Sequence, residues 1–145
     1  MNAEQGVLLN ILNKSIGHVA RLTTLYEGSP FSVRINKVKR NYTISEREIE
    51  IALKIEVVVT EFPHDHLKEK QTRTELEQFL SKKVEKEMNE VMEKLQKAKS
   101  DAIGLGRSVR AFHTKLYKDD WSEQFSTLKI PVKVEVEIVK SGILY

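Results

Sequence analysis

The longest regular pattern of apolar and polar positions runs from Arg73 to Lys99 and predicts a single long helix. Its apolar residues recur at steps of three and four, which places them on one side of a helix with 3.6 residues per turn. They are Leu76, Phe79, Leu80, Val84, Met88, Val91, Leu95 and Ala98. The positions between them are mostly charged or amide-bearing, and neither Pro nor Gly interrupts the stretch. A helix with one apolar stripe is not stable alone, so it must lie on another element.

Alternation of apolar and polar residues predicts strands elsewhere in the chain. The clearest are 49–60 and 130–138, where every second residue is Ile, Leu or Val. The segment 31–44 alternates at first and then loses its register at 37–38, which indicates a β-bulge. The β-branched and aromatic residues of 18–26 favour a further strand. Each alternating strand predicts one buried face and one solvated face.

Two shorter helices are predicted after the long one. Ser100-Asp101 interrupts the helical pattern, and an aspartate at this place suits the N-cap of a second helix over 102–117. Asp119-Asp120 opens a third, short helix, whose first turn favours acidic side chains. The order β-β-β-α-α-α-β predicts an α+β fold. We expect a mostly antiparallel sheet of four to five strands, with one long and two shorter helices packed on one face.

Composition narrows the class of protein. The chain has 145 residues, of which 40% are hydrophobic and 31% charged, as in a single folded domain in water. It contains no cysteine, which excludes disulfides, zinc–thiolate sites and thiol catalysis. The net charge of +3 is too small to indicate nucleic-acid binding by itself. No apolar run is long enough to span a membrane, and no signal-peptide pattern opens the chain.

A succession of short motifs near the C-terminus carries a family resemblance. In order, they are Ser100-Asp101-Ala102-Ile103-Gly104-Leu105-Gly106, Arg110, Lys115-Leu116-Tyr117, Trp121, Phe125 and a Val-alternating strand that ends at Ser141-Gly142. This succession resembles the C-terminal domain of the C subunit of spore germinant receptors, the Ger(x)C family. In that family a long charged helix leads into an Asp–hydrophobic–hydrophobic–Gly–hydrophobic–Gly segment, a short Trp-containing helix and a final strand followed by Gly. The preceding hairpin, closed by Glu61, also fits, and the resemblance covers residues 15–142.

The resemblance implies that residues 1–145 are one domain, the C-terminal part of a larger lipoprotein. Family members carry a signal peptide and a lipidated cysteine, so a lipid anchor absent from this sequence would hold the protein at the spore inner membrane. The family's C subunit works with membrane A and B subunits in the response to small nutrients. The resemblance implies no enzymatic activity and no cofactor. We therefore expect a non-catalytic domain that acts in assembly or signalling with those subunits.

Few residues are candidates for chemistry. His64-Asp65-His66, with Glu69 nearby, is the one cluster of metal-ligating residue types, and two imidazoles with a carboxylate suit zinc. The cluster follows Pro63, where a solvated connection is expected, and its spacing matches no known zinc motif. Asp119-Asp120 is not a paired-carboxylate site, because adjacent helical residues point about 100° apart, so N-capping explains it better. We expect no metal and no catalytic residue.

Two glycines and the single tryptophan have competing interpretations. Gly104 and Gly106 are not a phosphate loop, since a third glycine is missing and the segment follows a helix. They predict instead a close approach between this segment and a neighbouring element. Trp121 is a candidate anchor for a binding partner. The alternative is that its ring closes the edge of the hydrophobic core.

A basic segment completes the candidate interaction surface. Arg34, Lys37, Lys39 and Arg40 lie in 31–44, which contains no acidic residue, and together with Trp121 they form the surface that we predict. On a regular strand Lys37 and Lys39 share one face, and Arg34 and Arg40 share the other.

The cations of 31–44 have an explanation that needs no ligand. If 31–44 pairs with 49–61, the residues Glu50, Glu56 and Glu61 can face them across the hairpin. The alternative function is a small basic domain that binds nucleic acid or another protein through 31–44. Attraction to anionic headgroups is a further hypothesis for a domain beside a membrane. We expect no nucleic-acid partner.

Overall fold

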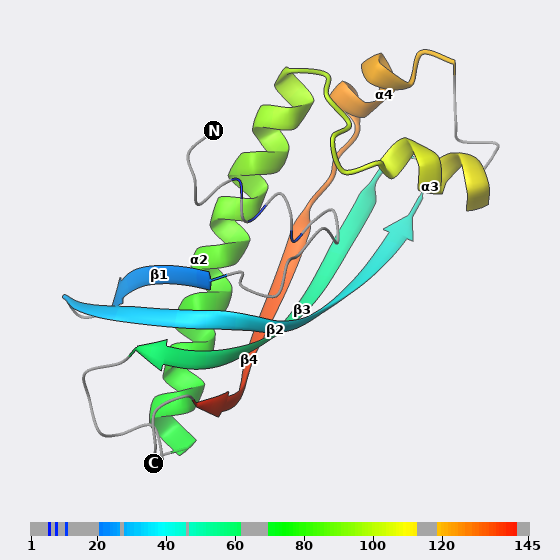
Figure 1. Ribbon diagram of the computed structural model, residues 1–145. Coiled ribbons are helices and arrows are strands. Elements are labelled where there is room, and N and C mark those ends of the chain that lie inside the picture. The colour runs from blue at the N-terminus through cyan, green and yellow to red at the C-terminus, as the bar shows by residue number, and fades with distance from the viewer. Residues whose placement is uncertain are drawn as a thin grey trace.

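The computed structural model describes residues 21–26, 28–45, 47–61, 70–112 and 119–141, together with Gly6, Leu8 and Ile11. These residues form one sheet and three helices in the predicted order (Figure 1). The elements are β1 (Arg21–Tyr26), β2 (Ser29–Ile44), β3 (Ile49–Glu61), α2 (Lys70–Lys97), α3 (Leu105–Phe112), α4 (Trp121–Thr127) and β4 (Val132–Ser141). The predicted α+β fold is therefore confirmed. No helix among the described residues is long and apolar enough to cross a membrane.

The four strands lie in the sheet in the same order as in the chain. β1 pairs with β2 and β2 with β3 in antiparallel fashion, whereas β4 runs parallel to β3. A parallel neighbour needs a long crossover connection, and the three helices supply it. Figure 1 shows α2 running along the twisted sheet, with α3 and α4 together at one end.

The β2–β3 ladder contains two register shifts. The one between Ile35 and Lys37 leaves Asn36 as an extra residue, so the predicted bulge is confirmed one residue before the expected place. An extra residue reverses which face of the sheet the following side chains occupy. This reversal decides the composition of the surface described below.

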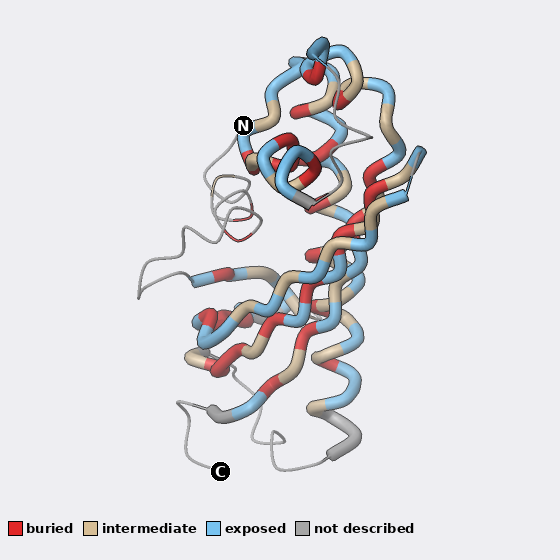
Figure 2. The backbone as a smooth tube through the Cα atoms, turned by 90° about the vertical axis from the view of Figure 1, so that its right-hand side faces the viewer, coloured by how far each residue is buried: buried red, intermediate tan, exposed pale blue. Residues whose placement is uncertain are grey.

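The core lies between the sheet and α2. All six alternate residues predicted on the inner face of β3 are buried, as is most of the predicted stripe of α2 (Figure 2). The buried residues of these two elements are Ile49, Ile51, Leu53, Ile55, Val57, Val58, Val59, Leu76, Leu80, Val84, Met88, Val91, Met92 and Leu95. Phe79 is half-buried, and Ala98 is exposed because the helix ends before it.

The ends of the helices differ from those predicted. α2 begins at Lys70 and ends at Lys97, and α3 begins at Leu105 rather than at residue 102. Capping of α4 by Asp119-Asp120 was expected, but Asp120 at the N-cap position makes no side-chain hydrogen bond to the helix. Its backbone has φ −90° and ψ 45°, outside the extended region from which an N-cap side chain reaches the first helical N–H groups.

The outer edge of β4 is closed by side chains of α2. The backbone N–H of Val132 donates to Asn89 Oδ1 over 2.9 Å, and Asn89 Nδ2 donates back to the carbonyl oxygen of Val132 over 3.0 Å. Three further N–H groups of β4 each donate to an α2 side chain. The bonds are Val134 to Glu85 Oε1 (2.9 Å), Val136 to Ser81 Oγ (2.8 Å) and Ile138 to Glu77 Oε2 (2.8 Å). Four helical residues rise about 6 Å and two strand residues about 6.6 Å, so the two rows stay in step.

Candidate interaction surface

Four cations gather on the solvent-facing side of β1 and β2. Arg34, Lys37 and Lys39 of β2 are exposed, and the exposed Arg21 of β1 lies directly opposite Arg34. Lys37 and Lys39 share a face as predicted, and the bulge at Asn36 brings Arg34 to that same face. We call Arg21, Arg34, Lys37 and Lys39 the basic patch.

The acidic residues of β3 compensate little of this charge. Lys37 lies opposite Glu56, but Lys39 lies opposite Lys54, which forms its ion pair with Glu137 of β4 at 3.6 Å. The other acids of the hairpin do not face cations, since Glu50 is opposite Thr43 and Glu61 is opposite Ser32. The expected charge pairing therefore holds by register only at Lys37. No ion pair within the described ranges involves a member of the basic patch.

Arg40 does not belong to this surface. The bulge turns it to the inner face of the sheet, opposite the buried Leu53, so the expected grouping of Arg34 with Arg40 is wrong. Its guanidinium carbon lies 5.3 Å from the centre of the Tyr42 ring, a cation–π contact. Its Nε and Nη1 atoms are buried and make no hydrogen bond.

The inner environment of the sheet shifts the pKa of Tyr42. Burial raises the pKa of the Tyr42 hydroxyl above its ordinary value of 10.0, the nearby positive charge of Arg40 opposes the rise, and the negative charge of Asp101 adds to it. A tyrosine that holds its proton more tightly is a poor general base at neutral pH.

Asp101 organises the corner where α3 and α4 meet. Its carboxylate accepts hydrogen bonds from the backbone N–H groups of Leu105 (2.8 Å) and Gly106 (2.7 Å) and from Trp121 Nε1–H (2.8 Å). Asp101 thus caps the first free N–H groups of α3, although it lies four residues before the helix begins and not at the adjacent position. One carboxylate thereby connects the two short helices.

The two glycines of this corner have different roles. A Cβ on Gly106 would lie 2.5 Å from Trp121 Nε1, so only glycine permits this approach of ring to helix. A Cβ on Gly104 would meet nothing within 4 Å, so the close approach expected there is absent. Gly104 has φ +74°, a backbone conformation that favours glycine for steric reasons.

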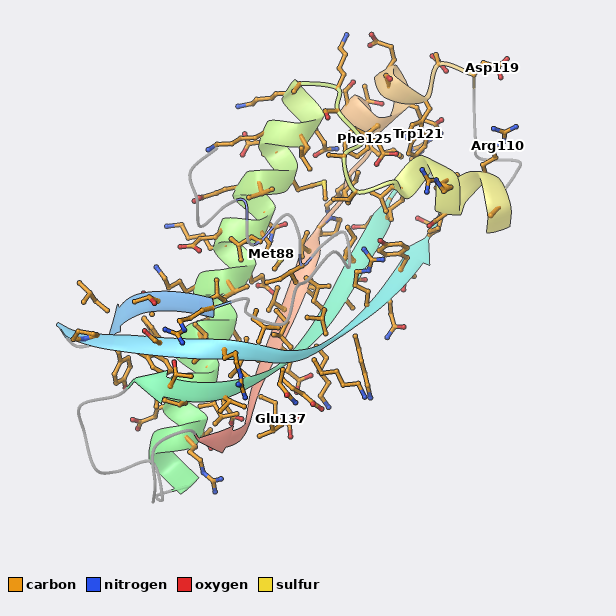
Figure 3. The ribbon with its side chains drawn as sticks, in the orientation of Figure 1. Met88, Arg110, Asp119, Trp121, Phe125 and Glu137 are labelled. Carbon is orange, nitrogen blue, oxygen red and sulfur yellow. The ribbon has the colours of Figure 1, made fainter. Side chains whose placement is uncertain are left out.

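Trp121 lies inside the molecule rather than on the basic patch. Its side chain is 9% exposed, and its ring centroid lies 6.2 Å from that of Phe125, beside it on α4 (Figure 3). Trp121 was expected in the interaction surface, but its indole N–H and ring are taken up by Asp101, Gly106 and Phe125. The structure thus keeps Arg34, Lys37 and Lys39 together and separates Arg40 and Trp121 from them.

The predicted metal-ligating cluster lies outside the described residues. This applies to His64-Asp65-His66 and to Glu69. In the part of the chain that the structure does describe, no group of three or more His, Cys, Asp or Glu side chains is placed to hold a metal ion.

Sequence reasoning missed two features of the surface. Arg21 was not linked to the basic segment, because only the strand register places it opposite Arg34. The polar row Glu77, Ser81, Glu85 and Asn89 was not distinguished from the other polar positions of the long helix, although its regular step of four beside the apolar stripe is a signal in the sequence.

Comparisons with known proteins identify a family and a solved structure of the same fold. The family model described as "Spore germination B3/ GerAC like, C-terminal" matches residues 1–142. The crystal structure of the GerBC protein superposes with a TM-score of 0.81 at 24% sequence identity, over 96% of this chain and 46% of GerBC. The chain thus spans less than half the length of GerBC, and at this identity the likeness shows the fold. No curated protein sequence matches the chain.

Proposed function

The chain belongs to the family of GerAC-like C-terminal domains, and we propose that it is a non-catalytic domain of a germinant receptor C subunit, which acts in assembly or signalling with the membrane A and B subunits during spore germination. The observation that carries the proposal is the family match over residues 1–142. The fold shared with GerBC supports it. The proposed location is the spore inner membrane, where the lipid anchor typical of the family would hold the whole protein.

The basic patch is the surface that we propose for contact with the partner subunits. Arg21 opposite Arg34 and Lys39 opposite Lys54 are like-charge pairs, which cost stability when they face each other across strands. A binding role for an anionic partner accounts for cations that stability alone would disfavour. Complementary charge also speeds association and selects against wrong partners.

Nucleic acid is the second candidate for the patch. The same sheet face carries Glu56 on β3 and Glu135 and Glu137 on β4. In the ladders Glu56 lies opposite both Lys37 and Glu137, and Glu135 lies opposite Lys54. These carboxylates repel a polyanion that extends beyond β1 and β2. An acidic segment of a protein matches a patch of this size better.

The test is capture of the A and B subunits from detergent extracts of spores by the immobilised domain. Reversal of three patch charges, Arg34→Glu with Lys37→Glu and Lys39→Glu, is expected to reduce capture about tenfold or more, because each exposed attraction becomes a repulsion. The matched control is Arg47→Glu with Lys97→Glu and Arg107→Glu, the same change in net charge at three exposed cations outside the patch. It should leave capture within about twofold, since rim charges away from the contact contribute little.

Two results would count against the proposal. Equal loss of capture in the two triple variants would remove the patch from the contact. No capture by the folded wild-type domain, together with retention on DNA that decreases with added salt, would favour the nucleic-acid function instead.

A further inference from the structure

The outer edge of β1 differs from that of β4 in having no described strand or helix row paired with it. β1 is the terminal strand of the sheet opposite β4, and within the described ranges no strand pairs with its far side. An edge strand presents alternate backbone N–H and C=O groups that can pair with an added strand. β1 contains no Pro, and its one charged residue is Arg21 at its beginning.

A groove lies between the end of β1 and α2. It has a volume of about 660 Å³ and opens to solvent. Thr24 and Leu25 line it on the β1 side, and Leu25 is 64% exposed, which is high for a large apolar residue. On the helix side lie Phe79, Lys82, Lys83, Lys86, Glu87 and Glu90. Phe79 contacts Tyr26 with ring centroids 5.1 Å apart, so the aromatic pair holds β1 and α2 together beside the groove.

The helix wall of the groove presents two exposed cations, Lys82 and Lys86. Lys83 is bound to Glu87 at 3.1 Å, whereas Lys82 and Lys86 are exposed and take part in no ion pair with another described residue. They stand four residues apart, about 6 Å along the helix. Side chains on one face of an extended segment repeat every two residues, about 6.6 Å.

The molecule already matches this helical step to a strand at its other edge. There the row Glu77, Ser81, Glu85 and Asn89 meets every second residue of β4. The same helix can therefore bind an extended segment on its β1 side with the same matched spacing. There Lys82 and Lys86 would make the contacts that the row from Glu77 to Asn89 makes with β4.

We propose that the outer edge of β1 and the facing surface of α2 bind an extended, acidic segment of a partner protein, which adds to the sheet as a further strand. Backbone hydrogen bonds to β1 supply affinity, and carboxylates two residues apart face Lys82 and Lys86. Side chains of the segment's opposite face are apolar and cover Leu25, which lies on the same face of β1 as Arg21. A second copy of β1 is unsuited to this place, since it carries Arg21 and no carboxylate. The proposal goes beyond the receptor function and does not depend on which subunit supplies the segment.

The probe is a blocked eight-residue peptide in which Glu and Val alternate, titrated into the isotope-labelled domain and followed by the amide signals of residues 21–26. Saturable shifts in these signals are expected. A peptide in which Glu and Pro alternate carries the same charge but lacks the proline N–H groups, and it should not produce them. The variant Lys82→Glu with Lys86→Glu should weaken binding of the Glu–Val peptide about tenfold, because two exposed attractions become repulsions.

The matched control is Arg34→Glu with Lys39→Glu in the basic patch, which should change binding of the peptide by no more than about twofold. Equal binding of the Glu–Pro peptide would overturn strand addition. Shifts confined to the amides near Arg34 and Lys39, or no shift of residues 21–26 at millimolar peptide, would overturn the site. Capture of the A and B subunits is measured separately, so failure here leaves the receptor proposal standing.

Discussion

At the β4 edge of the sheet, one row of α2 side chains occupies the outward N–H groups of the strand, whereas at the β1 edge an open groove separates the strand from the same helix. α2 extends the first arrangement beyond β4, because Gln96 Nε2 donates to the carbonyl oxygens of Phe125 (3.0 Å) and Leu128 (2.6 Å). On the other side the exposed residues include the cations of the basic patch and one large apolar residue, Leu25.

The difference indicates how one long helix serves two purposes. A free strand edge invites unwanted pairing, and proteins commonly block it. The α2 row blocks the β4 edge with neutral and acidic acceptors that match its N–H groups. Among the described residues, the cations of the β1–β2 side have no ion-pair partner and no strand pairs with the outer edge of β1, which suits contact with a partner. We therefore regard the β4 side as structural and the β1–β2 side as the binding side.

Among the substitutions that test this comparison, Asn89→Ala should lower the free energy of unfolding the most. It removes two hydrogen bonds to Val132, one in each direction, and leaves the partner groups under the helix. Unsatisfied buried groups predict a loss of about 2–3 kcal/mol in the free energy of unfolding. Urea denaturation measures it. Glu90→Ala, at an exposed position of the same helix, is the control; an equal loss in both variants would contradict a specific role for Asn89.

Ser81→Ala should have an intermediate effect. The substitution suits the helix but leaves the N–H of Val136 without its acceptor, so we expect a net loss of about 1 kcal/mol. The midpoint of urea unfolding reports it, with Lys82→Ala as the neighbouring exposed control. A stabilised Ser81→Ala variant would show that the ladder adds nothing at this point.

In β2, Tyr42 on the inner face of the sheet is expected to make stability depend on pH in the alkaline range. Because its pKa is raised in the folded protein, the unfolded chain loses the proton first. The contribution of Tyr42 to the free energy of unfolding is therefore fully present below pH 10.0. It decreases as the pH rises above that value through the pKa of the folded protein. Tyr42→Phe should show a smaller decrease over the same range in urea unfolding. The same slope in both proteins would assign the pH dependence to other groups.

Leu25→Thr should change the free energy of unfolding the least. Leu25 is 64% exposed, and threonine suits an edge strand, so the free energy of unfolding should change by less than about 0.5 kcal/mol. Thermal or urea unfolding tests this directly. A loss as large as that of Asn89→Ala would mean that the open edge is part of the core and not a free surface.

The fold was largely predictable because its signals are local. The alternation in β3 and the three-and-four spacing in α2 each specify a buried face without knowledge of their neighbours. The bulge at Asn36 was also detectable, from the loss of alternation near Lys37. The exact beginning of α3 was not, because it depends on Gly104 and on a carboxylate that caps from before the turn.

The candidate surface was predictable only in part, because its membership depends on register. Arg40 and Arg34 looked equivalent in the sequence, yet one extra residue turns Arg40 inward to Tyr42. The Trp121 side chain combines an apolar ring with a polar N–H, so the sequence alone does not show whether it faces inward. Its N–H faces inward because Asp101 accepts its hydrogen bond there. Glu77 and Glu85 have the composition of solvated helix positions, and only the nearby β4 makes them acceptors.

The most direct test of the two-sided account is hydrogen–deuterium exchange of the whole protein, alone and together with the proposed partners, the membrane A and B subunits. The account predicts slower exchange on assembly in residues 21–44, which cover β1 and β2, and no change in 132–141, which cover β4. Slower exchange in β4, with β1 and β2 unchanged, would contradict the assignment of the binding side.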